Sequence, residues 1–267
     1  MKTITLLGLA AAAGFSTAHG AVIASEDFQS YADGNFVGPA VAGDTSGGNG
    51  GTGWTGRWNS GNPTAATSGQ EILGGAVVYT GSGNQFAFRD FPAFPTPAAG
   101  TTATRWLSVD FQRSGSGGFR GVSLFRFPPG NGGSAEQVLI GGLADTNWSL
   151  GANGSTAGQQ ISSEDASTLR TGVVRFTIGD GNNGSAELWV APDAVTPVDV
   201  SGAPVATFNG LDIFGVNSLR IGSNGGQTVD NIIIGETAAD VGAVVPEPSS
   251  IGLLCLAFLG AFRRRRS

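Results

Sequence analysis

The sequence predicts an all-β fold, an antiparallel β-sandwich or jelly roll, flanked by an N-terminal signal helix and a C-terminal hydrophobic helix. In the central region apolar and polar residues alternate with period two, glycine-rich turns separate these runs, and no long amphipathic helical pattern is present. Hydrophobic residues make up 40% of the 267 positions, which is enough to bury a core. We expect three segments: residues 1–20, a single sandwich over 21–243, and a separate tail over 244–267.

The alternation is clearest in residues 107–111, 174–178 and 186–190, which we expect to be half-buried strands. The last two are expected to form a hairpin, because the connector 180–184 (Asp-Gly-Asn-Asn-Gly) is rich in residues that tolerate a positive φ. This connector also has a faint likeness to a calcium loop, but its spacing does not fit an EF-hand, so a plain turn is the preferred interpretation. Weaker strand patterns cover 21–28, 71–80, 85–89, 121–127, 137–141, 218–222 and 228–234.

The N-terminal segment is typical of a secretory signal peptide. Lys2 supplies the positive start, residues 4–15 form the apolar stretch, and Ala18 and Gly20 supply the small residues that signal peptidase requires for cleavage before Ala21. The alternative is a buried N-terminal helix.

Several residue types occur only in the terminal segments, which restricts the chemistry of the sandwich. The only Lys, His and Cys of the chain are Lys2, His19 and Cys255. The central region therefore has no Ser-His-Asp triad, no Cys nucleophile, no Schiff-base lysine, no zinc held by His or Cys, and no disulfide. Between residues 21 and 245 there are nine arginines and 19 acidic residues, so the formal net charge is −10. Such a surface repels phosphate backbones, and we expect no nucleic-acid partner.

The tail combines a proline-flanked glutamate, a short apolar run and an arginine cluster. The apolar run, residues 249–262, would span about 21 Å as a helix, shorter than the roughly 30 Å that a comfortable transmembrane helix crosses. Arginines resist translocation and would stay on the cytoplasmic side, so this is a weak anchor of the stop-transfer type. The residues expected to hold it in the membrane are Ile251, Leu253, Leu254, Leu256, Phe258, Leu259 and Phe262, followed by Arg263, Arg264, Arg265 and Arg266.

Val245, Pro246, Glu247 and Pro248, with the apolar segment and the arginines behind them, resemble the PEP-CTERM sorting signal of Gram-negative bacteria. The resemblance implies recognition by an exosortase, an integral-membrane cysteine protease-transpeptidase, and processing near the Pro-Glu-Pro motif. It further implies an exported protein that is anchored transiently and then reaches the cell surface or the extracellular space, in species that make biofilm polysaccharide. The alternative is a plain membrane anchor.

The middle of the chain carries a more diffuse resemblance. The fragments EDFQSYADG, GGTGWTGRW, WLSVDFQRSG, GVSLFRF, VLIGGLADTNWSLG and VDNIIIG follow one another over residues 21–236. In this order they resemble the concanavalin A-like, or laminin-G-like, jelly rolls found in many PEP-CTERM proteins. The resemblance implies two antiparallel sheets of about six strands, one of them concave, with the first and last strands paired near Phe28 and Val229-Asp230. Calcium occurs in such domains, but no motif here supports a calcium site, and we expect no cofactor.

Three functions fit this fold. A binding module is favoured, because sugars stack on aromatic rings and bond to Asn, Asp and Arg, and the loop GGTGWTGRWNSGN offers Trp54, Arg57, Trp58 and Asn59. The alternative for both tryptophans is packing at the edge of the sandwich, where they would hold the loop in place. Trp106, Trp148 and Trp189 are expected in the core.

A glycoside hydrolase is the enzymatic alternative, and a structural role in the extracellular matrix is the third. A hydrolase needs two carboxylates about 5 to 9.5 Å apart. In residues 21–245 no two acidic residues stand at i and i+2, the spacing that would place both on one face of a strand. We therefore expect a non-enzymatic surface or matrix protein, with extracellular polysaccharide as the candidate partner.

Overall fold

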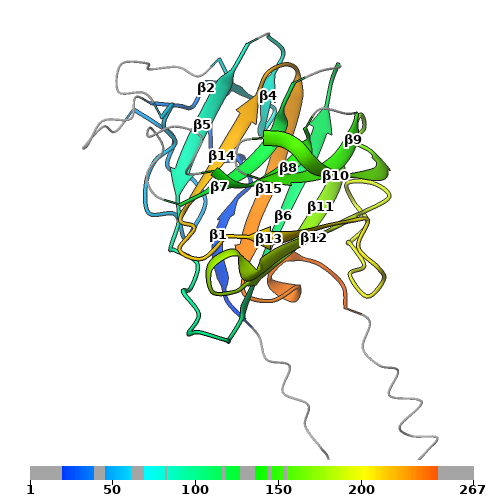
Figure 1. The fold of residues 1–267 in the computed structure, drawn as a ribbon. Coiled ribbons are helices and arrows are strands. Elements are labelled where there is room, and N and C mark those ends of the chain that lie inside the picture. The colour runs from blue at the N-terminus through cyan, green and yellow to red at the C-terminus, as the bar shows by residue number, and fades with distance from the viewer. Residues whose placement is uncertain are drawn as a thin grey trace, which may run out of the picture.

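A computed structural model describes residues 20–38, 46–61, 69–81, 83–115, 118–126, 136–143, 146–152 and 155–245, with the backbone alone for 155–157. The expected C-terminal helix and the expected signal segment before Gly20 lie outside these residues. Within the described ranges, no helix has the length and apolar character needed to cross a membrane. The described chain is an antiparallel β-sandwich of two sheets, as predicted (Figure 1).

The larger sheet contains nine of the described strands. β15 lies in its middle and contacts three neighbours, because β4 and β1 follow one another along the edge opposite β6. In order across the sheet the strands are β13 (Ala206–Leu211), β12 (Gly184–Val190), β11 (Arg170–Ile178), β6 (Ala103–Arg113), β15 (Gln227–Gly235), β4 (Ala76–Tyr79), β3 (Glu71–Leu73) and β2 (Gly34–Asn35), with β1 (Val22–Glu26) paired to β15.

The smaller sheet contains six described strands, again all antiparallel. Their order is β10 (Ser155–Asp165), β9 (Asn147–Ala152), β8 (Glu136–Gly142), β7 (Arg120–Phe125), β14 (Ser218–Ser223) and β5 (Gln85–Asp90). Two short 3₁₀ helices, η2 (Gly181–Asn183) and η3 (Ala239–Val241), complete the described elements.

The core lies between the sheets because one face of each strand is apolar. On β6, Leu107, Val109 and Phe111 point inward and are almost completely buried, as the period-two pattern requires. Trp148 of β9 meets Phe111 edge to face, with ring centroids 5.2 Å apart. This contact between rings from the two sheets closes the sandwich, and the expected burial of Trp148 is confirmed.

A second apolar cluster covers the outer face of the larger sheet. Trp106 of β6 and Trp189 of β12 are 8% and 5% exposed, and they pack against the chain that follows β15. Both were expected in the core, and both are buried as expected. They pack in this second cluster rather than between the two sheets, a difference that a strand pattern does not show because each face of a strand has the same period.

The predicted strand pairing is confirmed where turn chemistry or chain order indicated it. β11 and β12 form the expected hairpin, with Val174 opposite Leu188. The first and last strands also pair, with Ser25 of β1 opposite Ile233 of β15 (Figure 1). The pairing was expected near Phe28 and Val229-Asp230, but Val229 instead lies opposite Val77 of β4. The single strand expected over 71–80 is wrong: it is a hairpin of β3 and β4, since Gly74 and Gly75 both take a positive φ and turn the chain back. The strand patterns also missed β2, β9, β10 and β13.

Candidate functional site

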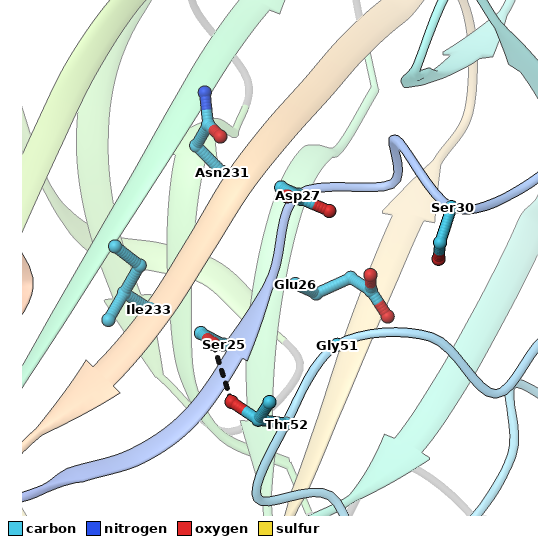
Figure 2. A pocket seen from close by; sticks show the side chains of 8 residues that line it. All are labelled: Ser25, Glu26, Asp27, Ser30, Gly51, Thr52, Asn231 and Ile233. Carbon is cyan, nitrogen blue, oxygen red and sulfur yellow. Dashed lines mark hydrogen bonds between the residues drawn. The ribbon is translucent and has the colours of Figure 1, made fainter.

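A pocket of about 430 Å³ opens beside the end of β1. Its walls come from three segments that are distant in sequence: β1 and the turn after it, the glycine-rich loop around residue 51, and the kink of β15 (Figure 2). Six of the eight lining residues have polar side chains, which carry hydroxyl, carboxylate or amide groups. The lining residues are Ser25, Glu26, Asp27, Ser30, Gly51, Thr52, Asn231 and Ile233.

The glycine-rich loop is held against β1 like an added strand. The backbone N–H of Ser25 donates to the carbonyl of Thr52 at 2.9 Å, and the N–H of Thr52 donates to the carbonyl of Ser25 at the same distance. Their hydroxyl oxygens lie 2.9 Å apart in a further hydrogen bond (Figure 2). One wall of the pocket is therefore fixed by backbone pairing, although the sequence shows no strand pattern in this loop.

The floor of the pocket rests on a buried ion pair. Arg89 of β5 donates to Glu26 Oε2 at 2.5 Å, and the two side chains are 2% and 0% exposed. The same oxygen accepts bonds from Tyr31 Oη at 2.7 Å and from Trp58 Nε1 at 3.3 Å. Burial, together with the hydrogen bond to Glu26, raises the pKa of Tyr31 to about 12. Burial likewise lowers the pKa of Arg89. Glu26 therefore ties β1 to β5 and to the loop, and its carboxylate is occupied by protein donors.

The kink of β15 places further acidic groups beside the pocket. The register shifts between Asp230 and Ile233, and Asn231 has φ +46°. Asp230 lies directly opposite Asp110 of β6, on the outer face of the sheet. Burial, with repulsion from Asp110, Asp27 and Glu26, raises the pKa of Asp230 to about 6.

Asp110 has partners for both of its carboxylate oxygens. Thr171 Oγ1 donates to Asp110 Oδ1 at 2.5 Å, and Asn231 Nδ2 donates to Asp110 Oδ2 at 2.7 Å. These bonds connect β11, β6 and the kink of β15. Among the described residues, no group of three His, Cys, Asp or Glu side chains is arranged to hold a metal ion.

The four loop residues predicted for glycan binding lie close together, but their side chains have different surroundings. Trp58 is completely buried between Phe28 and Phe36, with ring centroids 5.8 and 5.5 Å away, so its ring offers no free face. Trp54 lies 5.9 Å from Trp58, is only partly buried, and donates from Nε1 to the carbonyl of Ser25 at 2.9 Å. For Trp58 the packing agrees with the alternative in which the ring holds the loop.

Arg57 and Asn59 bond to the loop itself. Arg57 Nη1 donates to the carbonyl of Gly47 at 2.9 Å, and Asn59 Oδ1 accepts from the N–H of Gly61 at 2.9 Å. The backbone of Asn59 also pairs with Phe88 of β5. The predicted glycan-binding role of this loop stays a prediction.

The pocket residues were not predicted from the sequence, and neither was a second polar centre on the outer face of the smaller sheet. There Arg220 of β14 forms an ion pair and hydrogen bond with Glu136 of β8, and its guanidinium lies about 5 Å from the rings of Phe86, Phe119 and Phe125. Burial raises the pKa of Glu136, although Arg220 opposes that shift. The fragment EDFQSYADG contains three of the pocket residues, but as one strand end and its turn it gave no signal of a site.

Of the sorting residues, the structure describes Val245, which is 57% exposed. Pro246, Glu247, Pro248, the apolar segment and the arginine cluster lie outside the described residues.

Comparison with known proteins identifies the tail. Residues 244–266 match the family described as the PEP-CTERM protein-sorting motif. This motif occurs in proteins that are exported and held transiently in the membrane before they reach the cell surface or the extracellular space. The protein is therefore an exported surface protein of the exosortase-sorted kind. No curated protein matches the chain.

Solved structures resemble the sandwich in outline. An alginate lyase mutant in complex with an alginate tetrasaccharide is 13% identical, with a TM-score of 0.45, over 80% of this chain and 97% of that one. An endo-β-1,4-glucuronan lyase from the fungus Trichoderma reesei is 14% identical, with a TM-score of 0.40, over 79% and 97%. An endo-1,3-β-glucanase from Streptomyces sioyaensis is 13% identical, with a TM-score of 0.44, over 81% and 96%. At this identity the likeness concerns the fold alone.

Proposed function

We propose that this exported protein binds a glycan through the pocket beside β1 and does so without catalysis, as a component of the cell surface or matrix. The observation that carries the proposal is the set of groups that meet there. The hydroxyls of Ser25, Ser30 and Thr52, the carboxylate of Asp27 and the amide of Asn231 line one opening. A sugar presents neighbouring hydroxyls that both donate and accept, and carboxylate and amide groups satisfy both roles.

The charge around the pocket supports a neutral rather than an anionic sugar. The lining residues include the exposed carboxylate of Asp27 and no cationic side chain, whereas the carboxylate of Glu26 is buried and paired with Arg89. Asp230 adds a further acidic group nearby, and Arg89 compensates Glu26 alone. An anionic polysaccharide would be repelled at such a site. The partly exposed ring of Trp54 lies next to Ser25 and is the aromatic surface on which a sugar could stack.

A glycan array on the chain beginning at Ala21, followed by calorimetric titration of any ligand found, tests this proposal. Asp27→Ala is expected to weaken binding at least tenfold. Asp199→Ala is the matched control: both aspartates are exposed, and each accepts a bond from the backbone N–H two residues later, Asp27 from Gln29 and Asp199 from Ser201. Equal binding by the two variants contradicts a site at the pocket. No binding to any glycan by a folded chain favours the purely structural role.

The sorting step has its own test. Replacing Pro246 and Glu247 by alanine removes the core of the motif matched at residues 244–266. In a host that contains an exosortase, we expect the variant to stay unprocessed and associated with the membrane. Replacement of the exposed Val195 by alanine is the control, since this residue lies outside the matched range 244–266. Normal processing of the double variant contradicts exosortase recognition through this motif.

Hydrolysis of a polysaccharide is the second candidate function, and one observation favours it. Asp110 and Asp230 lie on neighbouring strands as a direct cross-strand pair, so their β carbons are about 5 Å apart. A raised pKa on one member of such a pair is what a general acid requires. Reducing-end release from neutral polysaccharides, abolished in Asp230→Asn, would support this function. The absence of release by the wild-type chain, with glycan binding present, supports the non-enzymatic proposal.

A further inference from the structure

The residues after β15 form a strap over the outer face of the larger sheet, and we call residues 236–244 the C-terminal strap. Within it Ala238, Val241 and Ala243 are buried against Trp106 and Trp189. The N–H of Ala243 donates to the carbonyl of Ala238 at 3.0 Å, which closes the turn around η3.

The last residue of the strap is also fixed to the domain. The N–H of Val244 donates to the carbonyl of Val198 at 2.8 Å, and the N–H of Val200 donates to the carbonyl of Val244 at 3.1 Å. The sorting-motif match begins at this same residue. The strap is therefore the base from which the sorting signal extends.

Asp240 holds the first turn of the strap. Its Oδ2 atom accepts bonds from the N–H of Thr237 at 2.8 Å and from Thr237 Oγ1 at 2.7 Å. This carboxylate faces the start of the described chain. A β carbon built on Gly20 would lie 2.3 Å from Asp240 Oδ2, so Gly20 packs directly against it.

The backbone of Ala21 is held at the same place, beside the end of β15. The strand that begins at the next residue, β1, lies along β15 (Figure 1). The carbonyl of Ala21 accepts a bond from the N–H of Glu236 at 3.1 Å. The nitrogen of Ala21 is bonded to the carbonyl carbon of Gly20. Because a β carbon on Gly20 would lie 2.3 Å from Asp240 Oδ2, standard bond lengths place this nitrogen within about 6 Å of the same oxygen.

We propose that removal of the signal peptide creates an ion pair between the new α-ammonium of Ala21 and Asp240, and that this pair fastens the C-terminal strap. Hydrolysis of the Gly20–Ala21 bond adds one water: Gly20 leaves with a carboxylate, and the nitrogen of Ala21 becomes a primary amine. That amine is mostly protonated at pH 7, because an α-amino group has a pKa of about 7.7 to 8. Cleavage thus replaces a neutral amide and the closely packed Gly20 by a cation beside Asp240. Cleavage at the N terminus thereby stabilises the C-terminal strap, from which the sorting signal extends.

The other charged groups at this place do not compete for the role. The carboxylate of Glu236 is paired with Arg105 at 3.4 Å. Asp240 has hydrogen-bond donors from Thr237 and no cationic partner among the ion pairs of the described residues. The α-ammonium is the cation that the mature chain would supply there.

The sequence permits a clean test. The chain from Ala21 to Ser267 contains no lysine, since the only lysine is Lys2, so an amine-directed acetylating reagent modifies the N terminus alone. Hydrogen exchange is measured on the free and the acetylated chain in detergent micelles. Acetylation is expected to speed exchange of the Ala243 and Val244 amides about two- to fivefold, the range of a partly exposed ion pair. The amide of Val205, bonded to Leu188 on β12, is the internal control.

Two variants decide whether Asp240 is the partner. In Asp240→Asn, whose amide oxygen still accepts from Thr237, acetylation should change nothing at Ala243 or Val244. In Glu236→Gln the effect of acetylation should persist. Unchanged exchange on acetylation of the wild-type chain, or the same increase in Asp240→Asn, overturns the proposal. An exported protein whose mass shows a first residue other than Ala21 overturns it as well.

Discussion

Arg89 Nη1 lies 2.5 Å from Glu26 Oε2, and this ion pair is closed to solvent beneath the rings of Trp54 and Trp58. It joins β1 of the larger sheet to β5 of the smaller sheet, with Tyr31 and Trp58 as additional donors to the same carboxylate. A buried charge is tolerated only with a partner, so this pair fixes the relative position of the two sheets beside the pocket.

Glu26→Gln is expected to destabilise the chain by about 3–5 kcal/mol, because it leaves the Arg89 charge buried without a counter-ion. Urea unfolding measures the difference. The control is Glu187→Gln, which breaks the ion pair between Glu187 and Arg175. The Glu187 side chain is 20% exposed and that of Arg175 is 41% exposed. That variant should cost less than about 1 kcal/mol. Similar costs for both variants would mean that burial does not decide the strength of the first pair.

The two loop tryptophans should respond differently to truncation. Trp58→Ala empties a site that is 0% exposed and is expected to cost about 3–5 kcal/mol in free energy of unfolding. Trp54→Ala should cost clearly less, because that ring is only partly buried. Trp54→Ala is therefore the suitable variant for a binding assay. Equal losses on urea unfolding would contradict the difference in packing.

The position of Gly172 on β11 leaves no room for a side chain. A β carbon there would lie 2.4 Å from Cζ3 of the buried Trp148. Gly172→Ala is expected to lower the free energy of unfolding by about 1–3 kcal/mol through overpacking. Gly202→Ala is the control, since a β carbon at Gly202 has no neighbour within 4 Å. If both variants unfold at the same urea concentration, the ring of Trp148 moves aside at little cost.

Asp230 gives the chain a pH dependence of definite sign. Its pKa in the folded chain, about 6, is above the ordinary aspartate value of 3.8, mainly because of burial and then because of its acidic neighbours. The folded state therefore keeps a proton that the unfolded state has lost between pH 3.8 and 6, and stability falls as the pH rises through that window. Asp230→Asn removes this loss of stability at high pH. The melting temperature of the variant should therefore exceed that of the wild type, and the difference should be larger at pH 7.5 than at pH 4.

Asp199 supplies a control of opposite sign for that experiment. Its hydrogen bonds with Ser201 lower the pKa of its carboxyl. Its contribution is therefore present above pH 3.8 and is lost as the pH falls. Asp199→Asn should not raise the melting temperature at pH 7.5. If Asp199→Asn raised the melting temperature at pH 7.5 as much as Asp230→Asn, the increase would be due to the change in net charge and not to the burial of Asp230.

Sequence patterns correctly predicted the strands that are specified by neighbouring residues in the chain. The hairpin of β11 and β12 was predictable because alternating side chains flank a connector of residues that tolerate a positive φ. The missed strands are different: β10, with the sequence STAGQQISSED, is polar along most of its length, and it pairs only at the edge of the smaller sheet with β9. Its strand structure depends on the neighbour, which a short-range pattern does not contain.

The pocket was beyond sequence reasoning for a related reason. Three of the lining residues, Asp27, Thr52 and Asn231, are far apart in the chain. No sequence motif around any of them indicates which other residues it contacts. They meet because β1 pairs with β15 and the glycine-rich loop pairs with β1. In the same way Trp54 and Trp58 share a motif, but only the packing around Phe28 and Phe36 decides that one ring is buried and the other is partly exposed.

The sequence by itself determined the destination of this protein and the type of its fold. A sorting motif is read by its partner as a short linear segment, and strand periodicity is a property of consecutive residues, so both are present in the chain before it folds. Tertiary structure alone decided the sheet order, the Glu26–Arg89 pair, the meeting of Asp110 with Asp230, and the contact between Gly20 and Asp240. Each of these joins residues far apart in sequence, and their contacts depend on long-range strand pairing and burial that no local pattern encodes.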